Sequence, residues 1–368
     1  MPLSPELTEF IKACIGGNTD RIETCLASGK VDINHLYSSG EHNEFGSGVD
    51  CTQLDLSCLH IAVFLNNEDV FYCLLNHGAD VNVLNSTYNT PLHTAAHSKR
   101  CSMLTDLLER GAHVNASNST HETALHLSCT YCGTNTPWSD LDSVFLVRQL
   151  IKFGADISAK NDRSDTALHT AVYYCNTEAA LFLLSNYSPT DTADAGDTFY
   201  DIVAPVVENG DVKVTKELIR HGVDINLVRK YDGEVGSLLH HAARFNQDKI
   251  VDILIDAGAS LDLGADLRTP HTAGWTALHI AVWGGHIRAV AALLRHGANP
   301  LLRRARRRHE QLGSATELTA SYLARTPYPT GIGRDGDVRR RFRANQNHAV
   351  EMVHVFGVDP SLGLPVTI

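Results

Sequence analysis

Apolar and polar positions alternate along this chain in a way that predicts pairs of short helices. In the stretch GWTALHIAVWGGHIRAVAALLRHGANP, residues 274–300, apolar side chains return at helical spacing in two runs: Leu278, Ala281 and Val282, then Ile287, Val290, Leu293 and Leu294. Thr276 precedes the first run, and a threonine hydroxyl can cap the free amides of a helix start. Gly297 follows the second run, and glycine readily takes the left-handed conformation that ends a helix. The stretch therefore predicts a helix, a tight turn and a second helix.

The same pattern recurs through the chain, marked each time by a leucine-histidine pair near the predicted start of the first helix. Six copies carry it, at His60, His93, His126, His169, His240 and His279. The first three of these histidines follow one another at intervals of 33 residues. Weaker copies cover Phe10–Asn34, Asp197–Asn226 and Thr316–Asp359. A unit this small cannot bury its apolar face alone, so stacking of successive copies is expected to stabilise the fold.

These copies resemble the ankyrin-repeat family, whose unit of about 33 residues carries the motif T-P-L-H-x-A. The chain reads TPLH at Thr90–His93 and TALH at Thr123–His126, Thr166–His169 and Thr276–His279. The resemblance covers nearly the whole chain. It implies an all-α ankyrin-repeat solenoid of about nine helix-turn-helix repeats joined by β-hairpin loops.

Departures from the repeat period divide the chain further. We expect a degenerate N-terminal repeat over 1–34, an inserted glycine- and serine-rich finger over 35–56, and the core ankyrin array over 57–302. A basic arginine-rich insertion (303–315), a degenerate C-terminal repeat with a loop insertion (316–359) and a tail (360–368) complete the division.

Charge is spread unevenly over the chain. The net charge is −11, yet the segment from Arg295 to Arg343 holds twelve arginines and four acidic residues. Its densest run contains Arg303, Arg304, Arg306, Arg307 and Arg308. Such a cluster can act as a nuclear import signal or contact an acidic partner. A solvated loop that pairs with the chain's own acidic repeats is the interpretation we favour, and we do not expect nucleic-acid binding.

Sequence features also bear on the compartment. No apolar run approaches the roughly 20 residues of a membrane span, and the N-terminal segment MPLSPELTEFIKAC lacks the apolar core of a secretory signal. Nine cysteines without an export signal favour a reducing compartment. We expect a monomeric cytoplasmic protein that does not bind a membrane, with the nucleus as the alternative location.

The spacing of His126, Cys129 and Cys132 is similar to part of a zinc site. However, Cys129 stands where the other repeats have small apolar residues, and no second C-x-x-C motif completes four ligands. The six repeat histidines are expected to be structural, each tied to backbone in its own turn. No nucleotide-binding, hydrolase, metalloprotease or kinase motif is present in the sequence. We therefore expect neither a metal nor a cofactor, and a protein that is not an enzyme.

Aromatic residues gather at one place in the repeat. The resemblance implies that the two positions after the small apolar pair of the first helix face the concave side, where partners of ankyrin proteins usually bind. Aromatic residues fill six of these twelve positions: Phe64, Tyr131, Tyr173, Tyr174, Phe245 and Trp283. Trp275, Tyr88 and His121 are further candidates at the hairpin tips. The alternative is that these rings turn back and cover the core.

Aromatic side chains and arginine dominate the energetics of protein interfaces. The sequence therefore predicts a non-catalytic protein-protein interaction module that holds a partner protein on the concave face. Two alternatives stay open: a substrate-recruiting adaptor for an enzyme such as a ubiquitin ligase, and a nuclear regulator that uses the arginine run for import.

Overall fold

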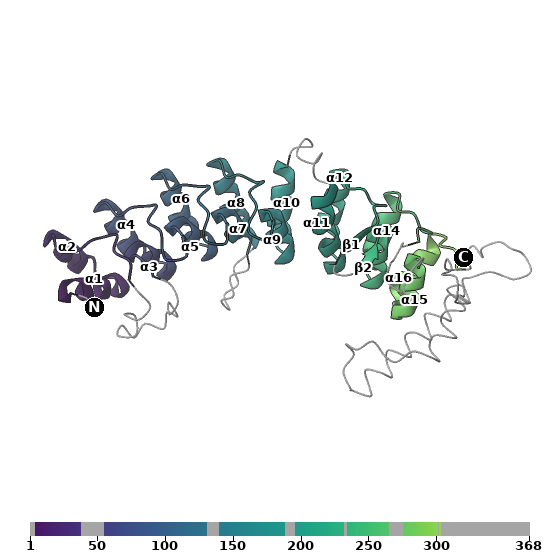
Figure 1. Cartoon of the computed structure of the whole chain (residues 1–368), viewed down its shortest axis with the longest axis horizontal. Helices are drawn as coiled ribbons and strands as arrows, with labels where there is room; N and C mark the ends of the chain where they lie inside the picture. The colour runs from purple at the N-terminus through teal and green to yellow at the C-terminus, as the bar shows by residue number, and fades with distance from the viewer. Residues whose placement is uncertain are drawn as a thin grey trace, which may run out of the picture. The chain divides into compact units, whose positions relative to one another are not determined.

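A computed structural model describes residues 4–37, 55–130, 140–187, 196–231, 234–264, 275–300 and 302. The chain divides into two compact units, residues 1–187 and 188–368. In each unit, successive helix pairs stack side by side (Figure 1). The predicted all-α repeat fold is thus confirmed, and eight helix pairs lie in the described part of the chain.

The first unit contains five helix pairs. They are α1 (Pro5–Gly16) with α2 (Thr19–Ala27), α3 (Cys58–Leu65) with α4 (Glu68–Asn76), α5 (Pro91–His97) with α6 (Cys101–Glu109), α7 (Ala124–Cys129) with α8 (Asp140–Lys152), and α9 (Ala167–Tyr173) with α10 (Thr177–Asn186). The first helices of the pairs pack against one another in one layer, and the second helices form another (Figure 1).

The second unit contains three helix pairs in its described part. They are α11 (Gly196–Asn209) with α12 (Val212–Arg220), α13 (Leu238–Arg244) with α14 (Asp248–Asp256), and α15 (Ala277–Gly284) with α16 (Ile287–Arg295). Here too, α13 packs against α11 and α15, and α14 packs against α12 and α16.

The threonine and histidine of the repeat motif explain where the first helices begin. Thr90 is the N-cap of α5, and it forms a capping box with His93: the threonine side chain accepts from the histidine amide, and the imidazole accepts from the threonine amide. The same reciprocal bonds start α7, α9, α13 and α15. Because these bonds satisfy amides that a helix start leaves free, they fix the first residue of each helix.

Glycine explains where the second helices end. Gly111, two residues after the end of α6, has a φ of 89°, and Gly154, two residues after α8, also has 89°. A side chain rarely tolerates this left-handed conformation, whereas glycine adopts it readily. The prediction that a left-handed glycine ends the second helix is therefore confirmed.

The core of each unit lies between the stacked helices. Leu92, Leu125 and Leu278 are buried at the motif's leucine position, and the small residues Ala95 and Ala281 are fully buried one helical turn later. Small side chains at these places allow neighbouring helices to approach closely.

The loops between repeats differ from the expected series of β-hairpins. Within the described ranges, strands pair only between β1 (Arg229–Tyr231) and β2 (Glu234–Gly236), which are antiparallel. Isolated bridges join Tyr37 to Leu56 and Ser117 to Thr123. Most described loops are instead closed by turns and side-chain hydrogen bonds.

Several predicted segments lie outside the described residues. These are most of the finger over 35–56, the arginine-rich insertion over 303–315, the repeat over 316–359 and the tail over 360–368. Among the described helices, none has the length and apolar character needed to cross a membrane.

Candidate protein-binding surface

Four of the six repeat histidines form a ladder of hydrogen bonds that joins successive repeats. In His93, Nδ1 accepts from the Thr90 amide over 3.1 Å, so the ring proton is on Nε2, which donates to the carbonyl of Glu122 over 3.2 Å. His126 makes the equivalent bonds to the Thr123 amide and the Asp165 carbonyl over 3.2 and 3.1 Å. The sequence predicted only the bond within the repeat's own turn; the second bond reaches the next repeat.

The ladder continues at His60 and His240. Their Nε2 atoms lie 3.0 Å from the carbonyls of Asn89 and Trp275, respectively. Burial lowers the pKa of both imidazoles to about 4, and burial also lowers the pKa of His93 and His126. These four rings are therefore neutral at pH 7. Since both nitrogens of each ring are engaged by backbone or by the capping side chain, these rings are structural.

His126 and Cys129, whose spacing is similar to part of a zinc site, are both occupied in the core. Both ring nitrogens of His126 are engaged, and Cys129 is fully buried in the core. Burial raises the pKa of the Cys129 thiol to about 11, which disfavours the thiolate that a metal requires. Cys132 lies outside the described residues.

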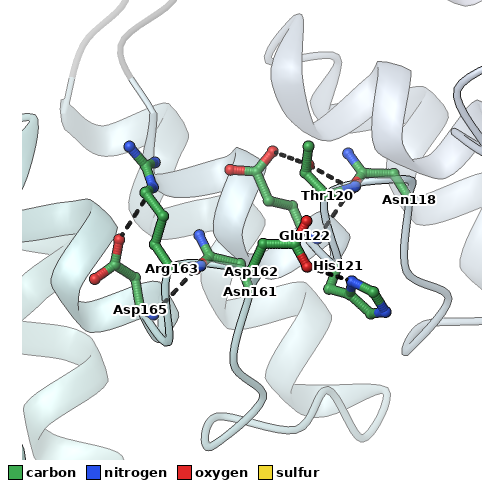
Figure 2. A network of polar contacts seen from close by, with 8 residues as sticks. All are labelled: Asn118, Thr120, His121, Glu122, Asn161, Asp162, Arg163 and Asp165. Carbon is green, nitrogen blue, oxygen red and sulfur yellow. Dashed lines mark hydrogen bonds and ion pairs between the residues drawn. The ribbon is translucent and has the colours of Figure 1, made fainter.

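Side-chain hydrogen bonds fix the loops beside the ladder. Figure 2 shows two successive loops, in which the Oδ1 atoms of Asn118 and Asn161 each accept from backbone amides two and four residues later, over 2.9–3.0 Å. The two loops are joined by His121 Nδ1 and Asp162 Oδ1, 2.6 Å apart, and by a bond from the Asp162 amide to the Thr120 carbonyl. These loops are therefore held in register along the stack.

Sequence reasoning missed a second ladder, made of asparagines at the bases of the loops. Asn82 Oδ1 accepts from the His113 amide over 2.8 Å, and Asn82 Nδ2 donates to the Gly111 carbonyl. Asn115 and Asn226 make the same pair of bonds to the repeats that follow them. The signal was available, because each of these asparagines lies four residues after the helix-ending glycine of its repeat.

Exposed aromatic side chains lie where the resemblance predicted a binding face. Among the described residues, nine large hydrophobic side chains are exposed, and five of them occupy the predicted positions: Phe64, Tyr173, Tyr174, Phe245 and Trp283. They lie at the ends of the first helices of their repeats or at the adjoining cap residue. The alternative that these rings are withdrawn into the core does not hold for these five.

The aromatic surface of the first unit consists of Phe64, Tyr173 and Tyr174. Tyr173 is the most exposed of the three, at 73 %, and its ring meets that of Tyr174 edge to face with centroids 5.1 Å apart. At the intervening positions, Ser98 and Thr130 are buried. Tyr88, at the tip of an adjoining loop, is also exposed.

The aromatic surface of the second unit consists of Phe245 and Trp283. The guanidinium of Arg244 lies 5.7 Å from the centre of the Phe245 ring. The Trp283 ring meets the Trp275 ring with centroids 6.0 Å apart and an angle of 69° between the planes. Each unit therefore presents aromatic side chains held in place by neighbouring groups.

Trp275 was predicted as a binding residue at the tip of a loop. Trp275 is only 2 % exposed, so its prediction as a tip residue is wrong. It directly precedes the helix-capping Thr276, one residue later in the motif than the tips Tyr88 and His121, and its ring packs back toward Trp283. Tyr131 and the five arginines Arg303, Arg304, Arg306, Arg307 and Arg308 lie outside the described residues.

Comparison with known proteins gives relatives for part of the chain. A segment of 101 residues is 40 % identical to palmitoyltransferase ZDHHC13 of Mus musculus, covering 27 % of this chain and 15 % of that protein. Palmitoyltransferase Hip14 of Drosophila melanogaster is 32 % identical over 122 residues, which cover 33 % of this chain and 18 % of that protein. Palmitoyltransferase ZDHHC17 of Rattus norvegicus is 38 % identical over 104 residues, covering 28 % and 15 %. The matched segment thus spans less than a fifth of each of these relatives, and it falls within the repeats.

A family comparison covers much more of the chain. The profile described as ankyrin repeats (3 copies) matches residues 10–118, 107–194 and 204–304. These ranges include every described helix pair except the first part of α1 and of α11. Ankyrin repeats are protein-interaction modules. The histidine ladder, the capped helix pairs and this family match together show that the chain belongs to the ankyrin-repeat family.

Proposed function

We propose that this protein is a non-catalytic interaction module that binds a partner protein on the aromatic surfaces at the ends of its first helices. The ankyrin resemblance predicts that this face is concave. One observation carries the proposal: five of the nine exposed large hydrophobic side chains of the described residues stand at equivalent positions of the repeat. Scattered exposed apolar residues are normal on a protein surface, whereas a set confined to one face marks an interaction site.

The physical reason is that the fold does not need aromatic residues at these positions. Ser98 and Thr130 occupy the same positions in other repeats of the first unit, and the helices α5 and α7 that precede them form without an aromatic residue there. Exposed rings such as Tyr173 therefore contribute little to stacking but offer a large apolar area with few rotatable bonds. Such side chains lose little conformational entropy on binding, which is why they serve as interface anchors.

The test compares variants of each unit with a matched control. Tyr173→Ala/Tyr174→Ala removes the paired rings of the first unit, and Phe245→Ala/Trp283→Ala removes those of the second. Phe145→Ala is the control, because Phe145 is 39 % exposed, close to the 40 % of Tyr174, but lies on the second helix α8. Proteins captured from lysate of the native organism would be identified for each bait and confirmed with purified components.

We expect a direct partner to be retained by the control and lost from at least one double variant. Loss of an anchor weakens an interface by about 2 kcal/mol or more, roughly 30-fold in affinity. Unchanged affinity of every confirmed partner for both double variants, at unchanged far-UV circular dichroism, would contradict the proposal.

The second candidate function is a substrate-recruiting adaptor for an enzyme. It is favoured by the matched relatives, which are named palmitoyltransferases and resemble this chain over the repeats alone. In this candidate, the aromatic surfaces hold a client while a different surface contacts the enzyme. An acyltransferase or ubiquitin ligase that is retained by both double variants, while another partner is lost, would support the adaptor function.

We also propose a cytoplasmic location, with nuclear import through the arginine run as the alternative. Comparison of a fluorescently tagged full chain with a variant lacking residues 303–308 tests it, because import through this run predicts that the deletion moves the protein out of the nucleus. A wild-type protein already excluded from the nucleus would rule out the regulator that imports itself.

A further inference from the structure

Three metal-ligating side chains meet on the second helices of the first two repeats, away from the aromatic surface. Cys73 and His77 lie one helical turn apart, Cys73 in α4 and His77 as its C-cap residue, and Glu23 comes from α2 of the preceding repeat. The ligand atoms of the three residues all lie within 4.8 Å of one another. Since α2 packs beside α4, the cluster bridges two repeats.

The three ligand atoms are close enough to hold one ion after a local rearrangement of the His77 ring. A tetrahedral zinc with bonds of 2.0–2.3 Å holds its ligand atoms about 3.3–3.6 Å apart. Cys73 Sγ and His77 Nδ1 are already 3.9 Å apart, and Nδ1 also lies 2.9 Å from the Cys73 carbonyl. The carbonyl can only accept, so Nδ1 carries the ring proton in this structure. To bind an ion through Nδ1, the imidazole must give up this bond and hold its proton on Nε2 instead.

The donor set selects the class of ion. A thiolate, an imidazole and a carboxylate together suit Zn²⁺, whereas Mg²⁺ and Ca²⁺ prefer oxygen ligands alone. Glu23 forms no ion pair with the other described residues, so its exposed carboxylate is available. Burial, followed by the nearby Glu23 carboxylate, raises the pKa of the Cys73 thiol. As at Cys129, this disfavours the free thiolate, so a Zn²⁺ ion would have to displace the thiol proton to solvent as it binds.

The place of the cluster in the fold gives a reason for such an ion. Only Ile22 of α2 is buried, whereas α4 buries Val70, Phe71, Cys73, Leu74 and Leu75. The first repeat therefore contributes little apolar contact through its second helix. An ion held by Glu23 on α2 and by Cys73 and His77 on α4 would fasten this repeat to its neighbour.

We propose that Glu23, Cys73 and His77 form a binding site for one Zn²⁺ ion, completed by water, that joins the first repeat to the second. This site is separate from the His126–Cys129–Cys132 spacing in the sequence. It escapes sequence inspection because Glu23 and Cys73 are 50 positions apart and belong to different repeats.

The test uses the full chain, reduced and freed of metal with a chelator, and titrated with Co²⁺ as a spectroscopic probe. We expect one equivalent of Co²⁺ to produce a near-ultraviolet thiolate-to-cobalt charge-transfer band with visible bands of four-coordinate cobalt, and Zn²⁺ to abolish both. Cys73→Ser should remove the charge-transfer band. Glu23→Gln and His77→Asn, which alter exposed side chains, should weaken binding about tenfold or more.

Two controls separate this site from incidental binding by the other histidines and cysteines. Cys101→Ser changes a cysteine at the start of the second helix α6 and should leave the band and the affinity unchanged. Hydrogen exchange should show Zn²⁺ slowing the α2 amides of the wild type but not of Glu23→Gln. The proposal is wrong if the wild type gives no charge-transfer band at one equivalent, or if Cys73→Ser keeps it.

Discussion

Acidification should destabilise this protein through its histidine ladder. Burial lowers the pKa of His60 and His240 to about 4 in the folded protein, against about 6.5 in an unfolded chain. Between these values the unfolded chain binds more protons than the folded one. Stability is therefore complete above about pH 6.5 and falls as the pH decreases toward 4.

The size of the effect follows from the two pKa values. At pH 5 nearly all of an unfolded chain's imidazoles carry a proton, whereas only about a tenth of the His240 rings in the folded protein do. The linkage relation then gives a loss of about 2 kcal/mol per histidine between pH 7 and pH 5. His93 and His126, whose pKa values burial also lowers, add to the loss in the same direction. Protonation of Nδ1 would remove the acceptor of the capping-box amide, which is the structural origin of the loss.

Urea unfolding at pH 7, 6 and 5 measures this dependence. His240→Asn should flatten the pH dependence of the second unit by about 2 kcal/mol over the range, because the titrating ring is gone. Leu239→Ala is the matched control: the adjacent buried leucine carries no proton, so its loss of about 2–5 kcal/mol should be the same at each pH. Unfolding free energies that differ by less than about 1 kcal/mol between pH 7 and pH 5, or an unchanged slope in His240→Asn, would refute this reasoning.

Three further predictions concern stability along the stack. Leu125→Ala should lower the free energy of unfolding by about 2–5 kcal/mol in a urea titration, since it removes a buried side chain at the motif's leucine position. Asn82→Ala should lower it by about 0.5–1.5 kcal/mol, because the exposed His113 amide and Gly111 carbonyl exchange their side-chain partner between repeats for water. Amides of α11 should exchange with deuterium faster than those of α5, because α11 contains Pro205, and Asp201 stands where other repeats have the ladder histidine.

The repeat periodicity made the helices and their ends predictable from sequence. The Thr90–His93 capping box and the left-handed glycines such as Gly111 involve residues close together in sequence, so their spacing alone carries the information. The hydrogen bonds between repeats could not be predicted in this way. The acceptor for each ladder histidine is a backbone carbonyl whose own residue varies, from Asn89 to Glu122 to Asp165, so no side-chain pattern indicates it.

The candidate surface was predictable in part for a related reason. Phe64, Tyr173 and Phe245 were located by counting from the small apolar pair of each first helix, and that counting holds because the helix is regular. The prediction for Trp275 was wrong because this residue precedes the helix. It lies in a loop where a shift of one residue separates an exposed tip from a buried inner position. Aligning the loops of repeats of unequal length does not show which of these two positions a residue occupies. The burial of the Trp275 ring in the structure does show it.

A repeat fold allows structural and functional positions to be separated within one chain. Positions that stacking requires hold similar residues in every copy, as the buried leucine before each ladder histidine does. Other positions differ between copies: Ser98, which is buried, and Tyr174, which is exposed, stand at the same place in two repeats. An aromatic ring that stays exposed at such a variable position contributes little to the stack. The reason to look for the partner at Tyr173, Tyr174 and Phe245 rather than at the repeat histidines is that hydrogen bonds within the stack account for the histidines, whereas these rings stay exposed to solvent.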